Sequence, residues 1–254
     1  MIYVGMDISS KSFMVHAINS KKKVVFNGEI KPTRGGLRQM IKDLGRQTKL
    51  VVFEAGNQLK WVALELKPIK SLHLHVVHPN EIKWISQSSA KTDRIDARKL
   101  AQLARGDMLP RKVHIVEGKV RQLRELISAR HTLQSKRVAL INSIRGCLKQ
   151  EGYRLPEKFF NHVNWRVHLE RMRLADTQKI ILSSFMTSIE SLYKAESELT
   201  DQILAIENED IRRLQSIPGI GGLSSRVIIG AVDSADRFDS KKAVAKYGAL
   251  TPRI

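Results

Sequence analysis

The first eighty residues alternate between short apolar runs and amphipathic runs. Apolar, β-rich segments that predict strands occupy residues 2–8, 13–18, 23–30, 50–54 and 72–77. Residues 19–21 (Asn-Ser-Lys) form a turn signal after the second segment, so we expect residues 13–30 to fold as a hairpin. Helix-compatible sequence fills the later intervals at about 37–47 and 57–66.

A hairpin followed by alternating strands and helices indicates a mixed sheet flanked by helices, which is an α/β architecture. The apolar run at residues 50–53 is typical of an interior strand. The order strand, strand, strand, helix, strand, helix, strand, helix is that of the RNase H-like fold. We therefore expect an RNase H-like (RuvC-like) catalytic domain over residues 1–110.

Helical periodicity dominates the following hundred residues. Apolar side chains recur at helical spacing from about 115 to 150, and a second helical pattern covers about 168–207. Two long helices around a short connection predict a helical hairpin over residues 111–208. The hairpin is either a coiled coil that joins subunits or two helices packed on their own domain. Residues 209–254 are expected to be the first part of a small helical C-terminal domain.

The net charge narrows the class of partner. Lys and Arg total 44 against 25 Asp and Glu, which gives a net charge of +19 and a pI near 10.2. Such a balance favours nucleic acid, with an acidic membrane surface as the alternative, because neutralised phosphates release condensed counterions. We expect no membrane span and no secretion signal. A single cysteine, Cys147, excludes a disulfide within the chain and favours a cytoplasmic location.

Four acidic residues stand at positions that suit metal chemistry. Asp7 ends the first predicted strand and Glu54 ends the fourth, while Asp93 and Asp96 lie three apart on one face of a predicted helix. If the two strands pair, Asp7 and Glu54 project from one edge of the sheet, where a returning helix can bring the aspartates opposite them. Clustered carboxylates repel one another unless a cation joins them. Oxygen ligands favour Mg²⁺ or Mn²⁺, and two such ions support in-line phosphoryl transfer.

Each of these acids also has a purely structural interpretation. Asp7 or Glu54 can end a strand and cap the turn after it. Asp93 can be an acid favoured by the dipole at a helix N-terminus, and Asp96 can pair with Arg98 or Lys99 at the surface. An acidic residue in an otherwise apolar strand favours a functional role over a structural one. The four acids together indicate a metal site more specifically than any one of them does alone.

The N-terminal part resembles the RuvC-like domain of insertion-sequence-110 family transposases. That family carries an Asp, Glu, Asp, Asp set whose last two members lie in a K-x-D-x-x-D-A-x-x-L-A context. Here that context reads Lys91, Asp93, Asp96, Ala97, Leu100 and Ala101. The C-terminal part is similar to the second domain of the family through residues 217–221 (IPGIG), Phe238 and residues 247–252 (YGALTP).

The resemblance implies a bridge-RNA-guided DNA recombinase. Its partners would be DNA and a structured guide RNA, its cofactor Mg²⁺ or Mn²⁺, and its assembly a homodimer or homotetramer. The resemblance further implies a serine nucleophile in a Ser-Gly context shortly after the L-x-P element, which here ends at Pro252. The sequence stops at Ile254 without such a serine, so we expect a C-terminally truncated chain.

The IPGIG segment has an interpretation of its own. A turn of this type followed by a helix is typical of a helix-hairpin-helix element, in which glycines let backbone N–H groups approach a phosphate. An ordinary turn between helices is the alternative. Candidate nucleic-acid-binding residues from this segment and from the helix of Asp93 and Asp96 are Lys91, Arg94, Arg98, Arg212, Arg213, Gly219, Gly221 and Arg226.

The sequence as a whole predicts a DNA transposase or site-specific recombinase with metal ligands at Asp7, Glu54, Asp93 and Asp96. Two alternatives stay open. One is a RuvC-like junction nuclease that uses activated water, and the other is a catalytically dead nucleic-acid-binding scaffold.

Overall fold

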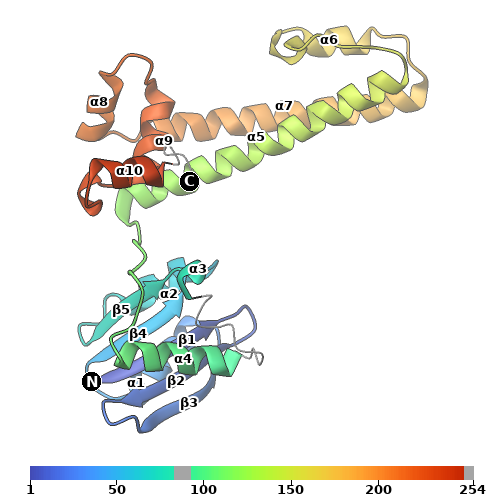
Figure 1. Cartoon of the computed structure of the whole chain (residues 1–254). Helices are drawn as coiled ribbons and strands as arrows, with labels where there is room; N and C mark the ends of the chain where they lie inside the picture. The colour runs from blue at the N-terminus through green and yellow to red at the C-terminus, as the bar shows by residue number, and fades with distance from the viewer. Residues whose placement is uncertain (83–92, 249–254) are drawn as a thin grey trace. The chain divides into compact units, whose positions relative to one another are not determined.

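The computed structural model describes residues 1–82 and 93–248, and it divides into two compact units, residues 1–115 and 116–254. Unit 1 holds the predicted α/β domain, and unit 2 is helical (Figure 1). No helix in the described residues is long and apolar enough to cross a membrane.

Unit 1 is built on a five-stranded mixed sheet. Its strands are β1 (Ile2–Ile8), β2 (Phe13–Asn19), β3 (Val24–Ile30), β4 (Lys49–Glu54) and β5 (Leu72–Val77). The spatial order is β3-β2-β1-β4-β5. β1 and β2 pair antiparallel, as do β2 and β3, whereas β4 runs parallel to both β1 and β5. The sequence prediction of a mixed sheet flanked by helices is confirmed, and this arrangement is consistent with an RNase H-like fold.

Helices cover both faces of this sheet. They are α1 (Arg34–Asp43), α2 (Leu59–Leu66), the short α3 (Pro79–Ile82) and α4 (Asp93–Arg105). Because side chains alternate along a strand, Ile2, Val4 and Met6 of β1 enter one core, which also contains Leu37 of α1 and Val62 of α2. The opposite face packs against α4 in a second core. Its members include Tyr3, Val52, Val77, Leu100 and Ala104.

A buried lysine closes the connection from α1 into β4. The Lys49 side chain is fully buried, and its Nζ donates to the carbonyl oxygens of Gly45 at 2.5 Å and Gln47 at 2.8 Å. Burial lowers the pKa of the Lys49 ammonium below its ordinary value of 10.5. The two carbonyls compensate for part of the desolvation and fix the loop before β4.

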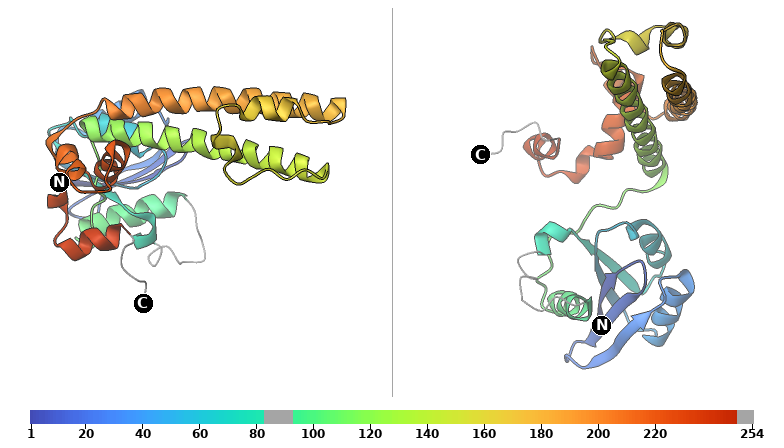
Figure 2. Two further views of the ribbon diagram at one scale, coloured as in Figure 1. Left: turned by 90° about the horizontal axis from the view of Figure 1, so that it is seen from above. Right: turned by 90° about the vertical axis from the view of Figure 1, so that its right-hand side faces the viewer.

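Unit 2 is an antiparallel hairpin of α5 (Gly118–Gln150) and α7 (Asp176–Leu204), joined through the 3-10 turn η1 (Phe159–Asn161) and α6 (Trp165–Glu170). Figure 2 shows the two long helices side by side. The predicted helical hairpin is confirmed, whereas a coiled coil that joins subunits stays a prediction. Ile144, Leu148, Trp165 and Ile189 lie in the core at the hairpin tip.

The prediction of one continuous helix over 168–207 was wrong, because α6 ends at Glu170 and α7 begins at Asp176. Between them, Met172 and Leu174 pack against the tip core, and the Tyr153 hydroxyl donates to the Arg173 carbonyl oxygen at 3.0 Å. These tertiary contacts turn the chain at a place where helical periodicity gives no signal.

Polar residues occupy the middle of the α5–α7 seam. Arg137 donates to both carboxylate oxygens of Glu196, from Nε at 2.6 Å and from Nη2 at 3.1 Å, and its guanidinium lies 4.2 Å from the Tyr193 ring centroid. Nearer the start of α5, the Nε of Arg130 donates to the Oγ1 of Thr200 on α7 at 2.8 Å. Arg130 and Arg137 therefore each have a specific partner on the facing helix, which fixes the register of the two helices.

The open end of the hairpin is closed by α8 (Glu209–Gln215), α9 (Gly222–Val232), the turn η2 (Ala235–Arg237) and α10 (Lys241–Tyr247). Leu123 of α5, Ile203 of α7, Ile211 of α8 and Ile229 of α9 form one core. The sequence analysis separated residues 209–254 from the hairpin. In the structure, α8 and α9 share a hydrophobic core with the hairpin, and the bounds of a separate C-terminal domain stay a prediction.

Candidate active site

Asp7 and Glu54 stand at the ends of two neighbouring parallel strands. In the register of β1 and β4, Gly5 pairs with Val52 and Met6 with Phe53. Asp7 and Glu54 are the next residues of their strands. Alternation places both on the face that packs against α4, opposite to the face of Met6 and Phe53. The parallel pairing of β1 and β4, which the sequence analysis required for these two residues to lie at one sheet edge, is present, while their joint role stays a prediction.

Helix α4 is held against this face by a close backbone contact. A Cβ atom on Gly5 would lie 2.0 Å from the Ala97 carbonyl oxygen and 2.6 Å from the Ala101 nitrogen. The absence of a side chain at Gly5, with alanine at both facing positions, lets the helix cross β1 this closely. α4 runs antiparallel to β1, so its first turn lies toward the end of the sheet where β1 finishes (Figure 1).

That first turn carries the other two predicted acids. Asp96 is half-buried and directly precedes the buried Ala97. Asp93 is the first residue of α4, but its side chain lies outside the described part of the chain, as does that of Arg94. Lys91 lies outside the described residues altogether.

Among the side chains that the structure describes, no three acidic, imidazole or thiol groups are gathered closely enough to hold a metal ion. Asp7 and Glu54 still provide oxygen donors of the kind that Mg²⁺ and Mn²⁺ prefer, at two adjacent positions. The donor set therefore fits a hard divalent cation in its chemistry. The meeting of all four acids stays a prediction.

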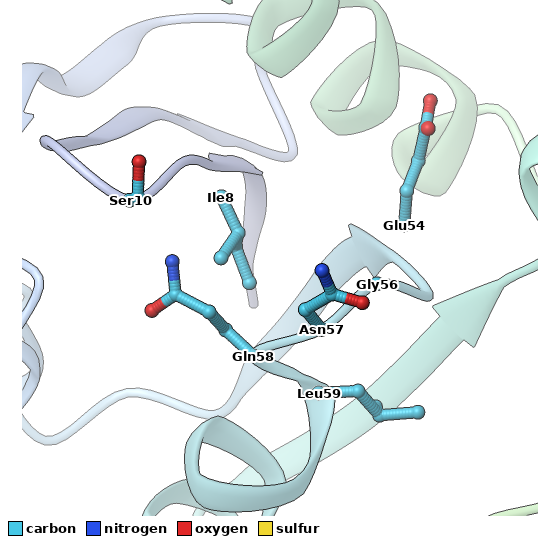
Figure 3. Close-up of a pocket in the computed structure, with 7 residues that line it drawn as sticks. All are labelled: Ile8, Ser10, Glu54, Gly56, Asn57, Gln58 and Leu59. Atoms are coloured by element: carbon cyan, nitrogen blue, oxygen red, sulfur yellow. The ribbon is translucent and has the colours of Figure 1, made fainter. Parts of the chain in front are cut away.

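A polar hollow of about 320 Å³ lies at the same strand ends. Open α/β sheets commonly bind ligands at this position. Its lining residues are Ile8, Ser10, Glu54, Gly56, Asn57, Gln58 and Leu59. Figure 3 shows the Glu54 carboxylate directed toward the side of the sheet that carries the α4 ribbon. Glu54 therefore belongs both to the hollow and to the face of Asp7.

Gln58 gives the hollow a rigid wall. Its Nε2 donates to the Ser9 carbonyl oxygen at 2.6 Å, and its Oε1 accepts from the Trp61 Nε1 at 3.1 Å. These bonds tie the β1–β2 turn to the start of α2. Sequence reasoning missed Ser10, Asn57 and Gln58, although the polar residues directly after Asp7 and Glu54 were a usable signal.

The predicted nucleic-acid-binding residues fall into different environments. Arg98 of α4 and Arg212 and Arg213 of α8 are exposed. Gly219 has a φ of +89° in the turn before α9, and Gly221 is the N-cap of that helix. The IPGIG turn joins α8 to α9, an arrangement that fits both the predicted helix-hairpin-helix element and an ordinary turn between helices, and contact with nucleic acid stays a prediction.

Arg226 needs a correction, because it is 2% exposed and its guanidinium is fully occupied inside unit 2. It donates to the carbonyl oxygens of Leu204 at 2.7 Å, Ile206 at 2.9 Å and Gly222 at 2.8 Å, and it pairs with Glu207. Arg226 thus satisfies the orphan carbonyls at the C-terminal end of α7. A phosphate would have to displace these partners, so we assign Arg226 a structural role.

Comparison with known proteins extends this picture. Residues 4–152 match the family model of IS110-type DEDD transposases, and residues 211–254 match the transposase IS116/IS110/IS902 family. The transposase for insertion sequence element IS1111A of Coxiella burnetii is 26% identical over 260 residues, which cover 98% of this chain and 68% of that protein.

These matches, on a chain with a mixed sheet and acids at its parallel strand ends, make the protein a transposase of an insertion sequence. Because the first family model spans more than half of the chain, it belongs to the IS110 family.

Proposed function

We propose that unit 1 carries a divalent-metal site for DNA strand cleavage and exchange during transposition, with Asp7, Glu54, Asp93 and Asp96 as its ligands. The observation that carries the proposal is the adjacency of Asp7 and Glu54 on the sheet face beneath α4. The two aspartates belong to the first turn of that same helix.

In this proposal the residues of unit 1 position the scissile strand. Asp7 and Glu54 would hold Mg²⁺ or Mn²⁺, which when bound neutralises charge on a reacting phosphate. Asp96, half-buried on α4, would complete the ligand set together with Asp93. Asn57 and Ser10 would offer hydrogen bonds to the strand in the neighbouring hollow, whose wall Gln58 keeps in place.

Unit 2 would hold nucleic acid and assemble subunits. Helix α5 is rich in Lys and Arg and has Glu125 as its only acidic residue, which suits a polyanion. Arg212 and Arg213 beside the IPGIG turn add exposed positive charge. We propose DNA and a structured guide RNA as partners, a homodimer or homotetramer as the assembly, and a serine nucleophile of the second family domain for strand exchange.

Calorimetry with Mg²⁺ and Mn²⁺ tests the metal site. The chain is compared with an Asp7→Asn, Asp96→Asn double substitution and with Asp43→Asn, a control at the exposed end of α1. Binding that the double substitution abolishes and the control retains would support one site formed by both acids. Equal binding in all three proteins, or no binding in any, would contradict the carboxylate site.

A further inference from the structure

The guanidinium of Arg237 packs against two aromatic rings near the C-terminal end of unit 2. Its central carbon lies 4.3 Å from the ring centroid of Phe238 and 4.5 Å from that of Tyr247. The two rings contact each other edge to face, with centroids 5.3 Å apart. Arg237 ends the turn η2 and Tyr247 ends α10, so this clamp joins two elements that are separated in sequence.

Two nitrogen atoms of this guanidinium make no hydrogen bond within the described part of the chain. Nε and Nη2 of Arg237 are buried and have no hydrogen-bond partner among the residues that the structure describes. These two atoms form one edge of the planar guanidinium, from which two N–H groups project in parallel. That edge matches a pair of oxygens on a carboxylate or a phosphate.

Arg137 shows what this edge does when a ligand is present. Its Nε and Nη2 hold the two carboxylate oxygens of Glu196, while the guanidinium stacks on Tyr193. Arg237 also packs against aromatic rings, but no oxygen of the described residues accepts from its Nε or Nη2. A buried charged donor without a partner is costly, so the site is built for an oxyanion that arrives from outside.

The nearby carboxylates do not fill this place. Asp236 accepts from the Ser234 hydroxyl, and no carboxylate of the described residues accepts a hydrogen bond from Nε or Nη2 of Arg237. The following helix α10 presents Lys241, Lys242 and Lys246 to solvent. Such a surface attracts an extended polyanion more than an isolated acidic side chain.

We propose that Arg237 binds one backbone phosphate of DNA through its Nε–Nη2 edge, with Phe238 and Tyr247 as positioning residues that pack against the guanidinium. The inference deepens the proposed function, since it takes DNA as the partner. Phosphate binding at these buried atoms requires a neighbouring side chain to move, and we propose that Tyr247 does so, since it is 53% exposed and belongs to none of the hydrophobic cores described above.

The test is fluorescence anisotropy with a labelled DNA duplex and the full chain, repeated over a series of salt concentrations. Arg237→Gln is expected to weaken binding about tenfold and to reduce the slope of log K against log salt by about 0.9, the value for one phosphate contact. Arg237→Lys keeps the charge but loses the paired donors, so it is also expected to bind severalfold more weakly. Tyr247→Leu, which removes one wall of the clamp, should fall between the wild type and Arg237→Gln.

Arg46→Gln is the matched control, because it removes the same charge from an exposed loop before β4. Thermal unfolding of each variant separates loss of binding from loss of fold. If Arg237→Gln unfolds, Arg237→Lys still tests the inference, because lysine keeps a long side chain at this position.

Unchanged affinity and salt slope in both Arg237 variants would overturn the inference and leave the proposed metal site unaffected. A change in oligomeric state at unchanged DNA affinity would also overturn it and indicate a protein carboxylate as the ligand. Failure of the unmodified chain to bind DNA would overturn both this inference and the proposed function.

Discussion

Gly5 of β1 and Ala97 of α4 are in backbone contact, since a Cβ atom on Gly5 would lie 2.0 Å from the Ala97 carbonyl oxygen. Gly5→Ala is therefore expected to push α4 from the sheet and to destabilise unit 1 by about 1–3 kcal/mol. Metal binding should weaken with it, because α4 carries Asp93 and Asp96. Urea unfolding measures the first effect and calorimetry the second. Gly28→Ala on β3, where a Cβ atom meets nothing within 4 Å, should change stability by less than about 1 kcal/mol.

Bound Mg²⁺ or Mn²⁺ is expected to raise the thermal stability of unit 1, because a ligand that binds only the folded chain stabilises it. At one hundred times the dissociation constant the gain is about 2.7 kcal/mol. Glu54→Gln should remove this gain, since Glu54 adjoins Asp7 at the strand ends. Thermal unfolding with and without the metal measures it. An equal gain in the wild type and in Glu54→Gln would place the bound metal elsewhere.

The Arg137–Glu196 pair fixes the register of α5 and α7, and its side chains are only 14% and 7% exposed. Glu196→Gln leaves the Arg137 charge buried and without its counter-ion, so unit 2 is expected to lose about 3 kcal/mol of stability. Replacing both residues together, Arg137→Met with Glu196→Leu, should cost much less. Glu190→Gln, which breaks a half-exposed pair with Arg166, should cost less than about 1 kcal/mol. Similar losses of unfolding free energy for Glu196→Gln and Glu190→Gln in urea would argue against a special contribution of the Arg137–Glu196 pair to the register.

Arg226 closes the end of α7 and is buried, so its role is expected to appear in stability and not in DNA affinity. Arg226→Met should destabilise unit 2 by roughly 2–3 kcal/mol, because three carbonyls and Glu207 lose a charged partner. The folded variant should keep the wild-type salt slope for DNA. Arg212→Met, at an exposed position of α8, should show the opposite pattern. A reduced salt slope in Arg226→Met would restore Arg226 as a phosphate ligand.

The buried Lys49 predicts a pH dependence of stability. Its pKa in the folded chain is lowered from 10.5 by burial, so between the lowered value and 10.5 the unfolded chain binds more protons than the folded chain. The free energy of unfolding therefore rises with pH in that window, while below it both states are protonated and the contribution is constant. Lys49→Met should lack this rise, and the exposed Lys42→Met should retain it. Urea unfolding at a series of alkaline pH values compares the slopes, which would coincide if Lys49 were ordinary.

The sequence by itself determined the elements of unit 1 and the chemistry of its acids. The strands at Ile2–Ile8 and Leu72–Val77 have the bounds that their apolar runs predicted, because these runs end at polar or proline residues. An acid after each of two apolar strands was equally visible. These signals depend only on residues that are close together in the sequence, so they can be recognised without knowing the tertiary structure.

Tertiary structure decided which of these signals meet. The Asp7–Glu54 adjacency depends on β4 pairing parallel with β1, although β2, β3 and α1 lie between these strands in the chain. The Gly5–Ala97 contact brings α4 over the same face of the sheet. The sequence suggested a surface charge at Arg226, but the fold surrounds its guanidinium with the carbonyl oxygens of Leu204, Ile206 and Gly222. Arg237 had no signal in the sequence, because its clamp joins the turn η2 to the end of α10. Long-range packing fixes such relationships, and residue type and spacing do not encode them.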